Sequence, residues 1–515
     1  MEKIELLYID LFCGAGGTST GVNSARLDDK QCAQVVACVN HDKNAIASHA
    51  ANHPEAMHFT EDIRTLELSP LLAHLQSCRK QNPDALVVLW ASLECTNFSK
   101  AKGGMPRDAD SRTLAEHLFR YIEAIKPDYI QIENVEEFMS WGEVDENGKP
   151  VSMDKGKSYT RWVRNVKKYG YNFDFRILNA ADYGAYTSRK RFFGIFAKKG
   201  LPITFPEATH SKEGSTSLFG SLEKWRPVRE CLDFDDEGDS IFGRKKPLVE
   251  ATLERIYAGL IKFVAEGKEA FIVKYNSVNK RTGKHIPPSI DEPCPTVATQ
   301  NRLGLAKVQF LSKQFSGDPM SKNVSVEAPA GAITCKDHHA FISVHYGNGS
   351  NRSCEQPAPT LTTKDKISLV TVKRFLLNPQ YKSAGGSIDK PCFTLIARMD
   401  KMPPYLMEAS TQSDELPDFI IPTAEGYTYC IYDTDTPMMV KIKEFMALYG
   451  IVEITMRMLK IPELKKIMGF PDDYVLVGTQ AEQKKYIGNA VEVTIARRWC
   501  EALCRRLKEY IKQAA

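Results

Sequence analysis

Two reactive side chains follow predicted strands at positions where they could act on one ligand. Cys95 comes just after the apolar run 85–90, in a loop rich in Ser, Thr and Asn, and Glu133 ends the apolar run 129–133. Such a cysteine is a candidate nucleophile, although a lone cysteine is more often a small buried residue. Because adjacent parallel strands end at one sheet edge, we expect Cys95 and Glu133 to lie close together. Two reactive groups at one edge indicate a catalytic site more strongly than either does alone.

A glycine-rich turn indicates a second binding feature. The segment Asp10-Leu-Phe-Cys-Gly-Ala-Gly-Gly17 joins a predicted buried strand, 5–12, to a helix from about Thr18. Glycines let the backbone approach a nucleotide-like ligand, and the helix N-terminus faces it, although a tight turn without a ligand is an equal alternative. The spacing is not Gly-x-Gly-x-x-Gly, and no Gly-Lys-Ser/Thr follows. These departures favour an adenosine ligand other than NAD or ATP.

Charged residues also stand where strands end. Asp42 follows the second predicted strand and Asp62 the third, where each could accept hydrogen bonds from an adenine or a ribose. Helix N-capping is the alternative role for either one. Arg189 and Arg191 alternate on an extended segment, so both should face one way and could contact a phosphate or another anion. A solvated charge pair is the alternative there.

Length and composition limit the classes of protein to which the chain can belong. A length of 515 residues allows two or three domains, and a net charge of +4 neither establishes nor excludes a nucleic-acid partner. The 13 cysteines include no Cys-x-x-Cys pair. Cys335 with His338 and His339 is the one cluster near metal spacing, and exposed loop residues are the favoured interpretation, so no metal is expected. Scattered thiols suit a reducing cytoplasm, and neither a signal peptide nor a membrane span is expected.

The predicted secondary structure that positions these residues changes along the chain. Strands alternate with helices over residues 1–200, which predicts a doubly wound α/β domain. An acidic run, Asp233–Asp239, marks a boundary. Beyond about residue 270, a proline-led turn entering a strand recurs at Pro293, Pro329, Pro357 and Pro391, which indicates a repeated β unit. Helical patterning returns from about 455 and ends in an amphipathic helix from Val491 to about Lys512.

In this order, the motifs resemble the DNA (cytosine-5)-methyltransferase family. The turn 10–17 is nearly that family's opening motif, Glu133-Asn134-Val135 is its Glu-Asn-Val motif, and Arg189-Lys-Arg191 is similar to its Arg-x-Arg. Residues 459–474 resemble its ninth motif, and Gly488-Asn-Ala-Val-Glu-Val493 resembles its last. The resemblance covers roughly residues 4–200 and 455–500.

The resemblance implies a fold and a cofactor. We expect a Rossmann-like, doubly wound mixed sheet in a catalytic domain, 1–235, completed by residues 455–515. A β-rich target-recognition domain is expected to be inserted at 236–454. The implied cofactor is S-adenosyl-L-methionine, in a pocket lined by Phe12, Gly14, Ala15, Gly16, Gly17, Asn40, His41, Asp42, Asp62, Ile63, Leu114, Asn489 and Val491.

It also implies a mechanism. The Cys95 thiolate would add to carbon 6 of a flipped-out cytosine, and Glu133 would hold ring nitrogen 3 and help to protonate it. Asn134 would brace the cysteine loop, while Arg189, with Arg191 beside it, would contact the base. The loop 100–112 would close over the site.

Three residues depart from the family pattern. Glu94-Cys95-Thr96 replaces the usual Pro-Cys-Gln, Asn40 replaces a glutamate at the ribose site, and Thr187 replaces a glutamine. Asn40 can still bond a ribose hydroxyl. A carboxylate at Glu94 should raise the pKa of the neighbouring thiol unless it is turned away or paired.

The expected partner is double-stranded DNA, with a cognate restriction endonuclease as a further candidate, and the protein is expected to be a monomer. The expected location is the cytoplasm of a prokaryotic or phage system, with the protein on the nucleoid when it is bound to DNA. Two alternatives stay open: a tRNA cytosine methyltransferase, and an inactive DNA-binding homologue. Candidate DNA contacts are Lys280, Arg281, Lys284, Arg302, Lys336 and Lys364, which could equally be solvated surface residues.

Overall fold

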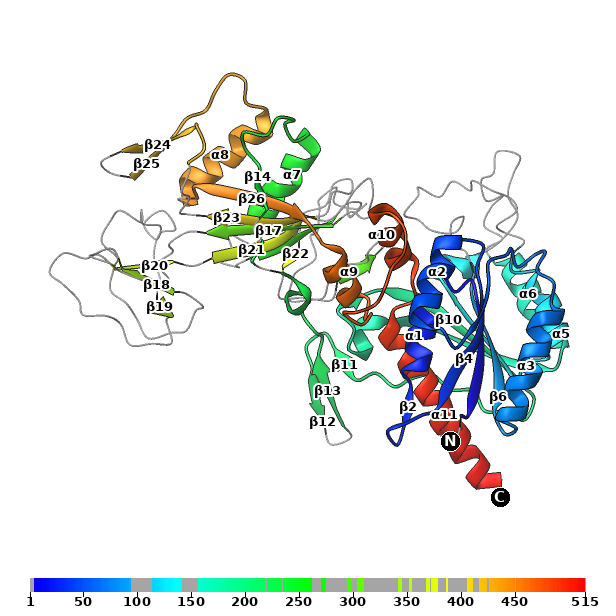
Figure 1. Ribbon diagram of the computed structural model, residues 1–515. Coiled ribbons are helices and arrows are strands. Elements are labelled where there is room, and N and C mark those ends of the chain that lie inside the picture. The colour runs from blue at the N-terminus through cyan, green and yellow to red at the C-terminus, as the bar shows by residue number, and fades with distance from the viewer. Residues whose placement is uncertain are drawn as a thin grey trace.

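The computed structural model shows two lobes, the first formed by the two end regions of the chain and the second by its middle (Figure 1). It describes residues 4–93, 114–140, 156–217, 220–233, 235–236, 238–261, 416–423, 426–449 and 451–514. Between residues 261 and 416 it describes only strand segments, namely 270–274, 294–297, 303–309, 341–344, 352–353, 367–370, 372–377, 386–387 and 405–410. In the described part of the chain, no helix combines the length and apolar character needed to cross a membrane.

The first lobe is built on a seven-stranded mixed sheet. Its order is β5 (Met57–Phe59), β4 (Ala33–Val39), β1 (Leu6–Leu11), β6 (Leu86–Ser92), β7 (Tyr129–Asn134), β10 (Lys190–Lys198) and β8 (Tyr171–Asn179). The first five strands are mutually parallel, and β10 runs antiparallel to both of its neighbours. All six residues of β1 are buried, as expected for a central strand covered on both faces. The predicted Rossmann-like fold is therefore confirmed.

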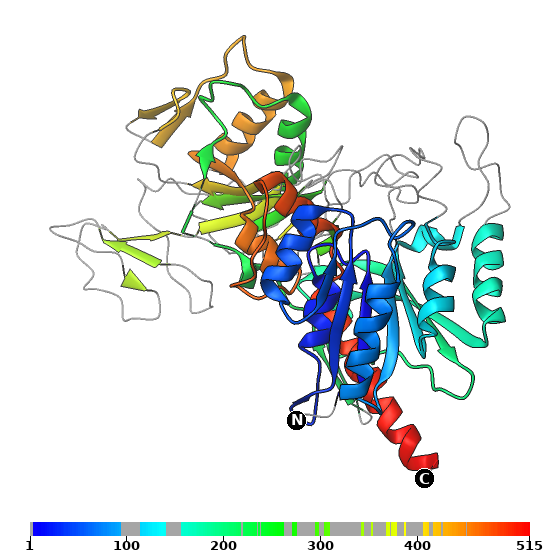
Figure 2. The ribbon, with the colours of Figure 1, turned by 45° about the vertical axis from the view of Figure 1, so that its right-hand side comes forward.

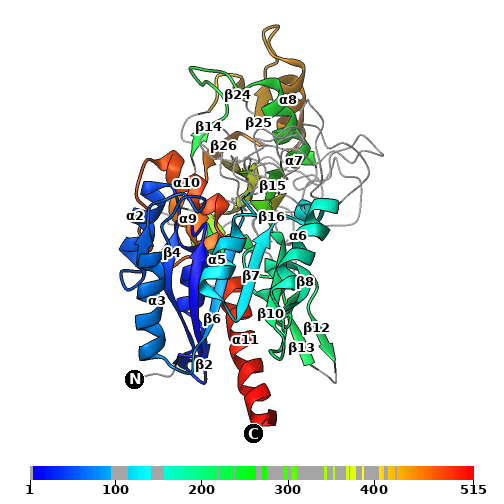
Figure 3. The same ribbon diagram turned by 90° about the vertical axis from the view of Figure 1, so that its right-hand side faces the viewer.

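Helices cover both faces of this sheet (Figures 1 and 3). One face packs against α3 (Ser69–Gln81), α5 (Leu118–Ile125) and α6 (Lys157–Lys168). The other packs against α1 (Gly17–Asn23) and the terminal helix α11 (Val493–Ala514), whose Trp499 is fully buried. Helix α2 (Lys43–Asn52) begins directly after Asp42, and α11 begins and ends two residues later than predicted. The last residues of the chain thus complete the first lobe.

Shorter elements complete the connections. The helical ones are η2 (Glu136–Ser140), η3 (Ala180–Tyr183), η4 (Val228–Cys231), α9 (Ile461–Ile467) and α10 (Gln480–Asn489). The strands are β2 (Arg26–Leu27), β3 (Lys30–Gln31), β9 (Thr187–Ser188), β11 (His210–Ser211), β12 (Ser215–Ser217) and β13 (Gly220–Lys224).

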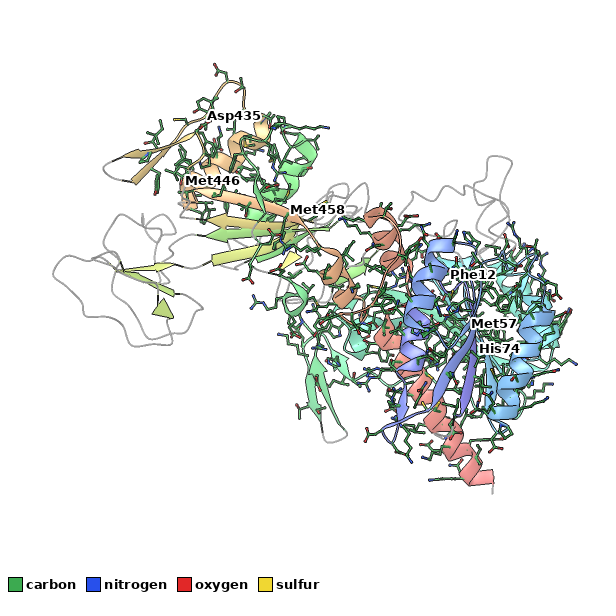
Figure 4. All side chains as sticks on the ribbon, in the orientation of Figure 1. Phe12, Met57, His74, Asp435, Met446 and Met458 are labelled. Carbon is green, nitrogen blue, oxygen red and sulfur yellow. The ribbon has the colours of Figure 1, made fainter. Side chains whose placement is uncertain are left out.

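The second lobe contains another sheet, whose hydrophobic core continues into the C-terminal segment at Leu464, Ile487 and Val493. The sheet order is β14 (Asp239–Ser240), β26 (Glu453–Met458), β17 (Leu303–Gln309), β23 (Tyr405–Ser410), β21 (Val372–Leu377) and β22 (Gly386–Ser387), and β15 (Ala270–Lys274) pairs with β17. Helices α7 (Glu250–Gly259) and α8 (Pro437–Tyr449) pack together in its core. Smaller pairings join β18 (Phe341–Val344) to β19 (Arg352–Ser353) and β20 (Ile367–Val370), and β24 (Ile420–Thr423) to β25 (Gly426–Tyr429). Met446 and Met458 mark this lobe in Figure 4.

The two crossings between the lobes lie side by side. Lys460 Nζ is 2.7 Å from an Asp233 carboxylate oxygen and 2.9 Å from one of Asp236. The acidic run thus pairs with the returning chain. Strand β26 extends across the predicted boundary at 454, and β14 pairs with it. The domain limits 235 and 454 remain predictions, and the structure indicates that the exit and the return form one joint.

The inserted segment also contacts the first lobe directly. Strand β16 (Cys294–Val297) pairs in parallel with β9, immediately before Arg189. This strand lies in the first copy of the proline-led repeat, and the other three copies lie outside the described residues. In Figures 2 and 3 the second lobe lies beyond the carboxyl ends of the parallel strands, the edge where α/β sheets bind ligands.

Candidate catalytic and cofactor site

The strand register brings the predicted catalytic segments to one edge. Ser92, the last residue of β6, lies opposite Glu133 of β7. Asn134 Nδ2 donates a hydrogen bond to the Leu93 carbonyl at 3.3 Å. Asn134 therefore holds the chain where it enters Glu94-Cys95-Thr96, as its predicted bracing role requires. Cys95 and its two neighbours lie outside the described residues, as do the loop 100–112 and all six candidate DNA-contacting residues.

Glu133 is a buried carboxyl group with two cationic neighbours. Its exposed fraction is 6%, and Arg191 Nε lies 3.4 Å from its Oε1. Burial raises the pKa of Glu133, and the charges of Arg189 and Arg191 partly oppose that rise. The two arginines therefore face one carboxyl group, as their alternate spacing predicted. They are 5% and 9% exposed, so the solvated-pair alternative is wrong.

Arg189 also links this edge to the C-terminal segment. Its Nη1 donates to the Gly488 carbonyl at 3.2 Å. Gly488 precedes Asn489, which is exposed at the end of α10, and Val491, which is buried against the first lobe. The last sequence motif thus lies beside the arginines and also beside the glycine turn.

Within the glycine turn, Gly14 has free space beside its backbone, whereas other residues fill the space beside Gly16 and Gly17. Phe12, Gly14 and Gly16 have positive φ values of 61°, 53° and 100°. A Cβ atom on Gly14 would meet no atom within 4 Å, whereas one on Gly16 would collide with the Tyr474 hydroxyl and one on Gly17 with the Val491 carbonyl. Space for a ligand therefore opens at Gly14, while the other two glycines are required by packing. Figure 4 shows Phe12 beside α2 at this end of the lobe.

Asp42 acts as a helix cap. Its Oδ1 accepts hydrogen bonds from the Asn44 and Ala45 amides at 3.0 and 3.1 Å, and from the Tyr486 hydroxyl at 2.9 Å. Burial would raise the pKa of Asp42, but hydrogen bonds from Ala45 and Tyr486 outweigh it and lower the pKa. The capping alternative is thus confirmed, and any cofactor contact must use what remains of this carboxylate.

The neighbouring strand ends offer further polar groups. Asn40 Oδ1 accepts the Asp42 amide at 2.9 Å, and His41 is exposed. Asp62 is one-third exposed and receives several hydrogen bonds from Arg64, the shortest of 2.6 Å, which lower its pKa. Both of its oxygens accept hydrogen bonds from Arg64, and the exposed third of its side chain leaves the carboxylate accessible to a ligand. Ile63 and Leu114 are buried and supply apolar surface.

Two tyrosines support the site and were missing from the predicted set. Tyr474 donates to the Ala15 carbonyl within the glycine turn, and Tyr486 donates to Asp42. Both come from the C-terminal segment, more than 400 residues away in sequence. Tyr474 ends the stretch 459–474 that resembles a family motif, and this was the one available signal for it.

Known proteins resemble this chain in the same regions. The family model described as C-5 cytosine-specific DNA methylase matches residues 6–230 and 377–505. The Type II methyltransferase M1.HphI of Haemophilus parahaemolyticus is 28% identical over 211 residues, which are 41% of this chain and 50% of the relative. M.XorII of Xanthomonas oryzae is 30% identical over 205 residues, which are 39% of this chain and 43% of the relative.

The chain spans about half the length of these curated relatives. A crystal structure of Spodoptera frugiperda DNMT2 aligns over 97% of this chain and 99% of its own, with 13% identity and a TM-score of 0.45.

Proposed function

The chain belongs to the C-5 cytosine-specific DNA methylase family, and from this premise we propose that it methylates carbon 5 of cytosine in a specific sequence of double-stranded DNA. The observation that carries the proposal is the edge formed by β6 and β7. There the strand that leads to Cys95 ends opposite Glu133, and Asn134 holds it in place.

Glu133 is suited to hold a proton for the base. Burial favours its neutral form, so it can donate a hydrogen bond to ring nitrogen 3 of cytosine. Arg191, at 3.4 Å, limits the rise in pKa and orients the carboxyl group. Such a group acts on a base only after that base has left the DNA stack, so the proposal includes base flipping.

Cys95 is the proposed nucleophile. Its thiolate forms a bond to carbon 6 as Glu133 delivers a proton to nitrogen 3, and the displaced electron pair makes carbon 5 nucleophilic. After carbon 5 has gained the methyl group, a base removes the carbon 5 proton, and the electron pair left behind re-forms the 5–6 double bond as the bond to sulfur breaks. Nitrogen 3 returns its proton to Glu133. Without the sulfur adduct, carbon 5 is too poor a nucleophile for the reaction.

The methyl donor of this family is S-adenosylmethionine, which supplies an electrophilic methyl group when bound. The residues present fit it: the open space at Gly14 accommodates a ligand against the backbone, and the partly exposed Asp62 offers a carboxylate acceptor. Ile63 and Leu114 offer apolar surface for the adenine. A cognate restriction endonuclease and a location with the nucleoid in the cytoplasm belong to the same proposal.

Bisulfite sequencing of DNA from cells that express the chain tests this function. We expect protected cytosines at one recurring sequence, and none with Cys95→Ser. Protected cytosines in tRNA but not in DNA would support the RNA methyltransferase alternative. Protection in neither nucleic acid, with a folded protein that binds DNA, would support the inactive homologue.

A further inference from the structure

A compact group of sulfur and imidazole donors lies next to the glycine turn. It comprises Cys13 from the turn, Cys38 from β4, His49 from α2 and His58 from β5. The donor atoms of Cys13, Cys38 and His49 all lie within 4.8 Å of one another, and these three residues are buried. The four residues are scattered in sequence, so no spacing rule could have predicted the group.

The separations suit a single small ion. His49 Nδ1 is 3.6 Å from Cys38 Sγ and 2.9 Å from His58 Nε2. Tetrahedral zinc, with bonds of about 2.3 Å to sulfur and about 2.0 Å to nitrogen, places its ligand atoms roughly 3.3–3.8 Å apart. The three residues already converge to within about an ångström of this arrangement, and His58 stands next to them as a fourth.

A hydrogen-bond chain prepares His49 as a ligand. The Ser19 hydroxyl donates to Asp10 Oδ2 at 2.8 Å, so its oxygen accepts the proton of His49 Nε2, also at 2.8 Å. In this arrangement, the lone pair of His49 Nδ1 points at Cys38 and His58. Protein zinc sites commonly orient their histidines through such a second hydrogen bond to a carboxylate, a carbonyl or water.

We propose that Cys13, Cys38, His49 and His58 bind one zinc ion in a closed structural site. Two thiolates and two neutral imidazoles around Zn²⁺ make an electrically neutral unit, which suits burial. With four protein ligands no position stays open for catalysis. The ion instead ties the glycine turn to β4, α2 and β5 and fixes the backbone beside Gly14.

A second thiol group in the same lobe provides a matched control. Cys32, Cys500 and Cys504 also bring their sulfur atoms within 4.8 Å of one another, but no histidine belongs to that group. It lies between β4 and α11 on the packed face of the sheet. Removing Cys500 should therefore leave zinc binding unchanged.

The test is the metal content of the full chain, purified without a metal-affinity step and analysed by mass spectrometry. We expect one zinc per chain in the wild type and in Cys500→Ala, and almost none in Cys38→Ala or His49→Ala. Cobalt loading of the wild type should produce thiolate charge-transfer and tetrahedral d–d absorption bands. Metal-free wild type that also gives no cobalt bands would overturn the proposal, as would zinc that is lost only in Cys500→Ala.

Ser19→Ala keeps all four ligands and tests the site without removing one. Loss of the hydrogen bond to His49 should weaken zinc affinity about 10–100-fold, measured by competition with a chromogenic chelator. Chelation of the wild type should also lower its melting temperature, and added zinc should restore it. An unchanged affinity in Ser19→Ala, together with a melting temperature that does not respond to chelator, would contradict the site even if the ligand variants fail to fold.

Discussion

Glu133 experiences two opposing influences whose balance sets its protonation. Burial favours the neutral acid, and the guanidinium groups of Arg189 and Arg191 favour the carboxylate. The proposed chemistry needs the neutral form at the moment when nitrogen 3 is protonated. Activity that depends on Glu133 should therefore be present below its pKa and decline as the pH rises through it.

Arg191→Met should move that decline. Removing a cation 3.4 Å from the carboxyl group leaves burial less opposed, so the pKa of Glu133 rises and the alkaline limb of the rate profile shifts to higher pH. The maximum rate should fall because the acid is less well oriented. Arg176→Met, at an exposed arginine of β8, is the control and should leave the profile in place. An unshifted limb in Arg191→Met would show that Glu133 does not control it.

Asp62→Ala should weaken cofactor binding. Loss of a hydrogen bond to a charged acceptor costs about 1.5–3 kcal/mol, which calorimetry with S-adenosylmethionine would measure. Asp174→Ala is a matched control, because Asp174 also pairs with an arginine two residues later but lies on β8, at the far edge of the sheet. Equal affinities for Asp62→Ala and wild type would remove Asp62 from the site.

At the residue scale, the sequence predicts which side chains gather at the site better than it predicts which other groups already hydrogen-bond to them. Glu133, Asn134 and the two arginines stand together, as their motifs indicated. Asp42 was expected at the cofactor, yet three donors from α2 and Tyr486 already occupy one of its oxygens. One of those donors comes from a helix over 400 residues away, and such a contact has no local sequence signal.

At the element scale, close packing of α1 against α11 joins the two ends of the chain. A Cβ atom on Gly21 would lie 2.7 Å from both the Ala496 side chain and the Val493 carbonyl. Gly17, one helical turn earlier, makes a similar approach to Val491. These glycines let the C-terminal segment sit directly behind the cofactor turn.

Gly21→Ala should therefore destabilise the protein, by about 1–3 kcal/mol in urea unfolding, because backbone atoms of α11 cannot move aside freely. Ala496→Gly removes one of the opposing atoms. The double variant should be less destabilised than the sum of the two single changes, with a coupling of about 0.5–3 kcal/mol. Strict additivity would show that the two helices adapt without strain.

Hydrophobic strands and helix caps were predictable at this scale because they are local. The central strands are buried runs whose bounds lie within two residues of the expected ones, and Asp42 caps α2. The pairing of β9 with β16 was not predictable, since it joins two short segments about 100 residues apart. Strand β26 was missed for a similar reason: its partners lie far away in the inserted segment.

At the scale of the whole molecule, the chain leaves the first lobe and returns to it at neighbouring points, which contact each other and form one joint. Arg457 pairs with Glu463 at 2.9 Å in a buried position, and Lys460 pairs with the acidic run. The acidic run predicts this boundary, but nothing in the sequence predicts that Lys460 pairs with it. The predicted insertion, 236–454, is therefore entered and left through this joint.

Target choice is predicted to reside in that insertion. Replacing residues 236–458 with the corresponding segment of a relative that methylates another sequence should transfer the relative's site, as read by bisulfite sequencing. The graft ends at 458 so that β26 stays whole, and a graft ending at 454 should fold less well because it divides β26. A folded chimera that keeps the original site would show that recognition lies elsewhere.

The central claim is covalent catalysis by Cys95, and trapping on a duplex that carries 5-fluorocytosine at the methylated position tests it most directly. Fluorine at carbon 5 cannot be removed as a proton, so the methylated adduct cannot release the enzyme. Wild type with S-adenosylmethionine should give a protein–DNA complex that survives denaturation, and Cys95→Ser should give none because its hydroxyl is a far weaker nucleophile. A wild-type protein that binds cofactor and DNA but never forms this complex would contradict the claim, as would equal trapping by Cys95→Ser.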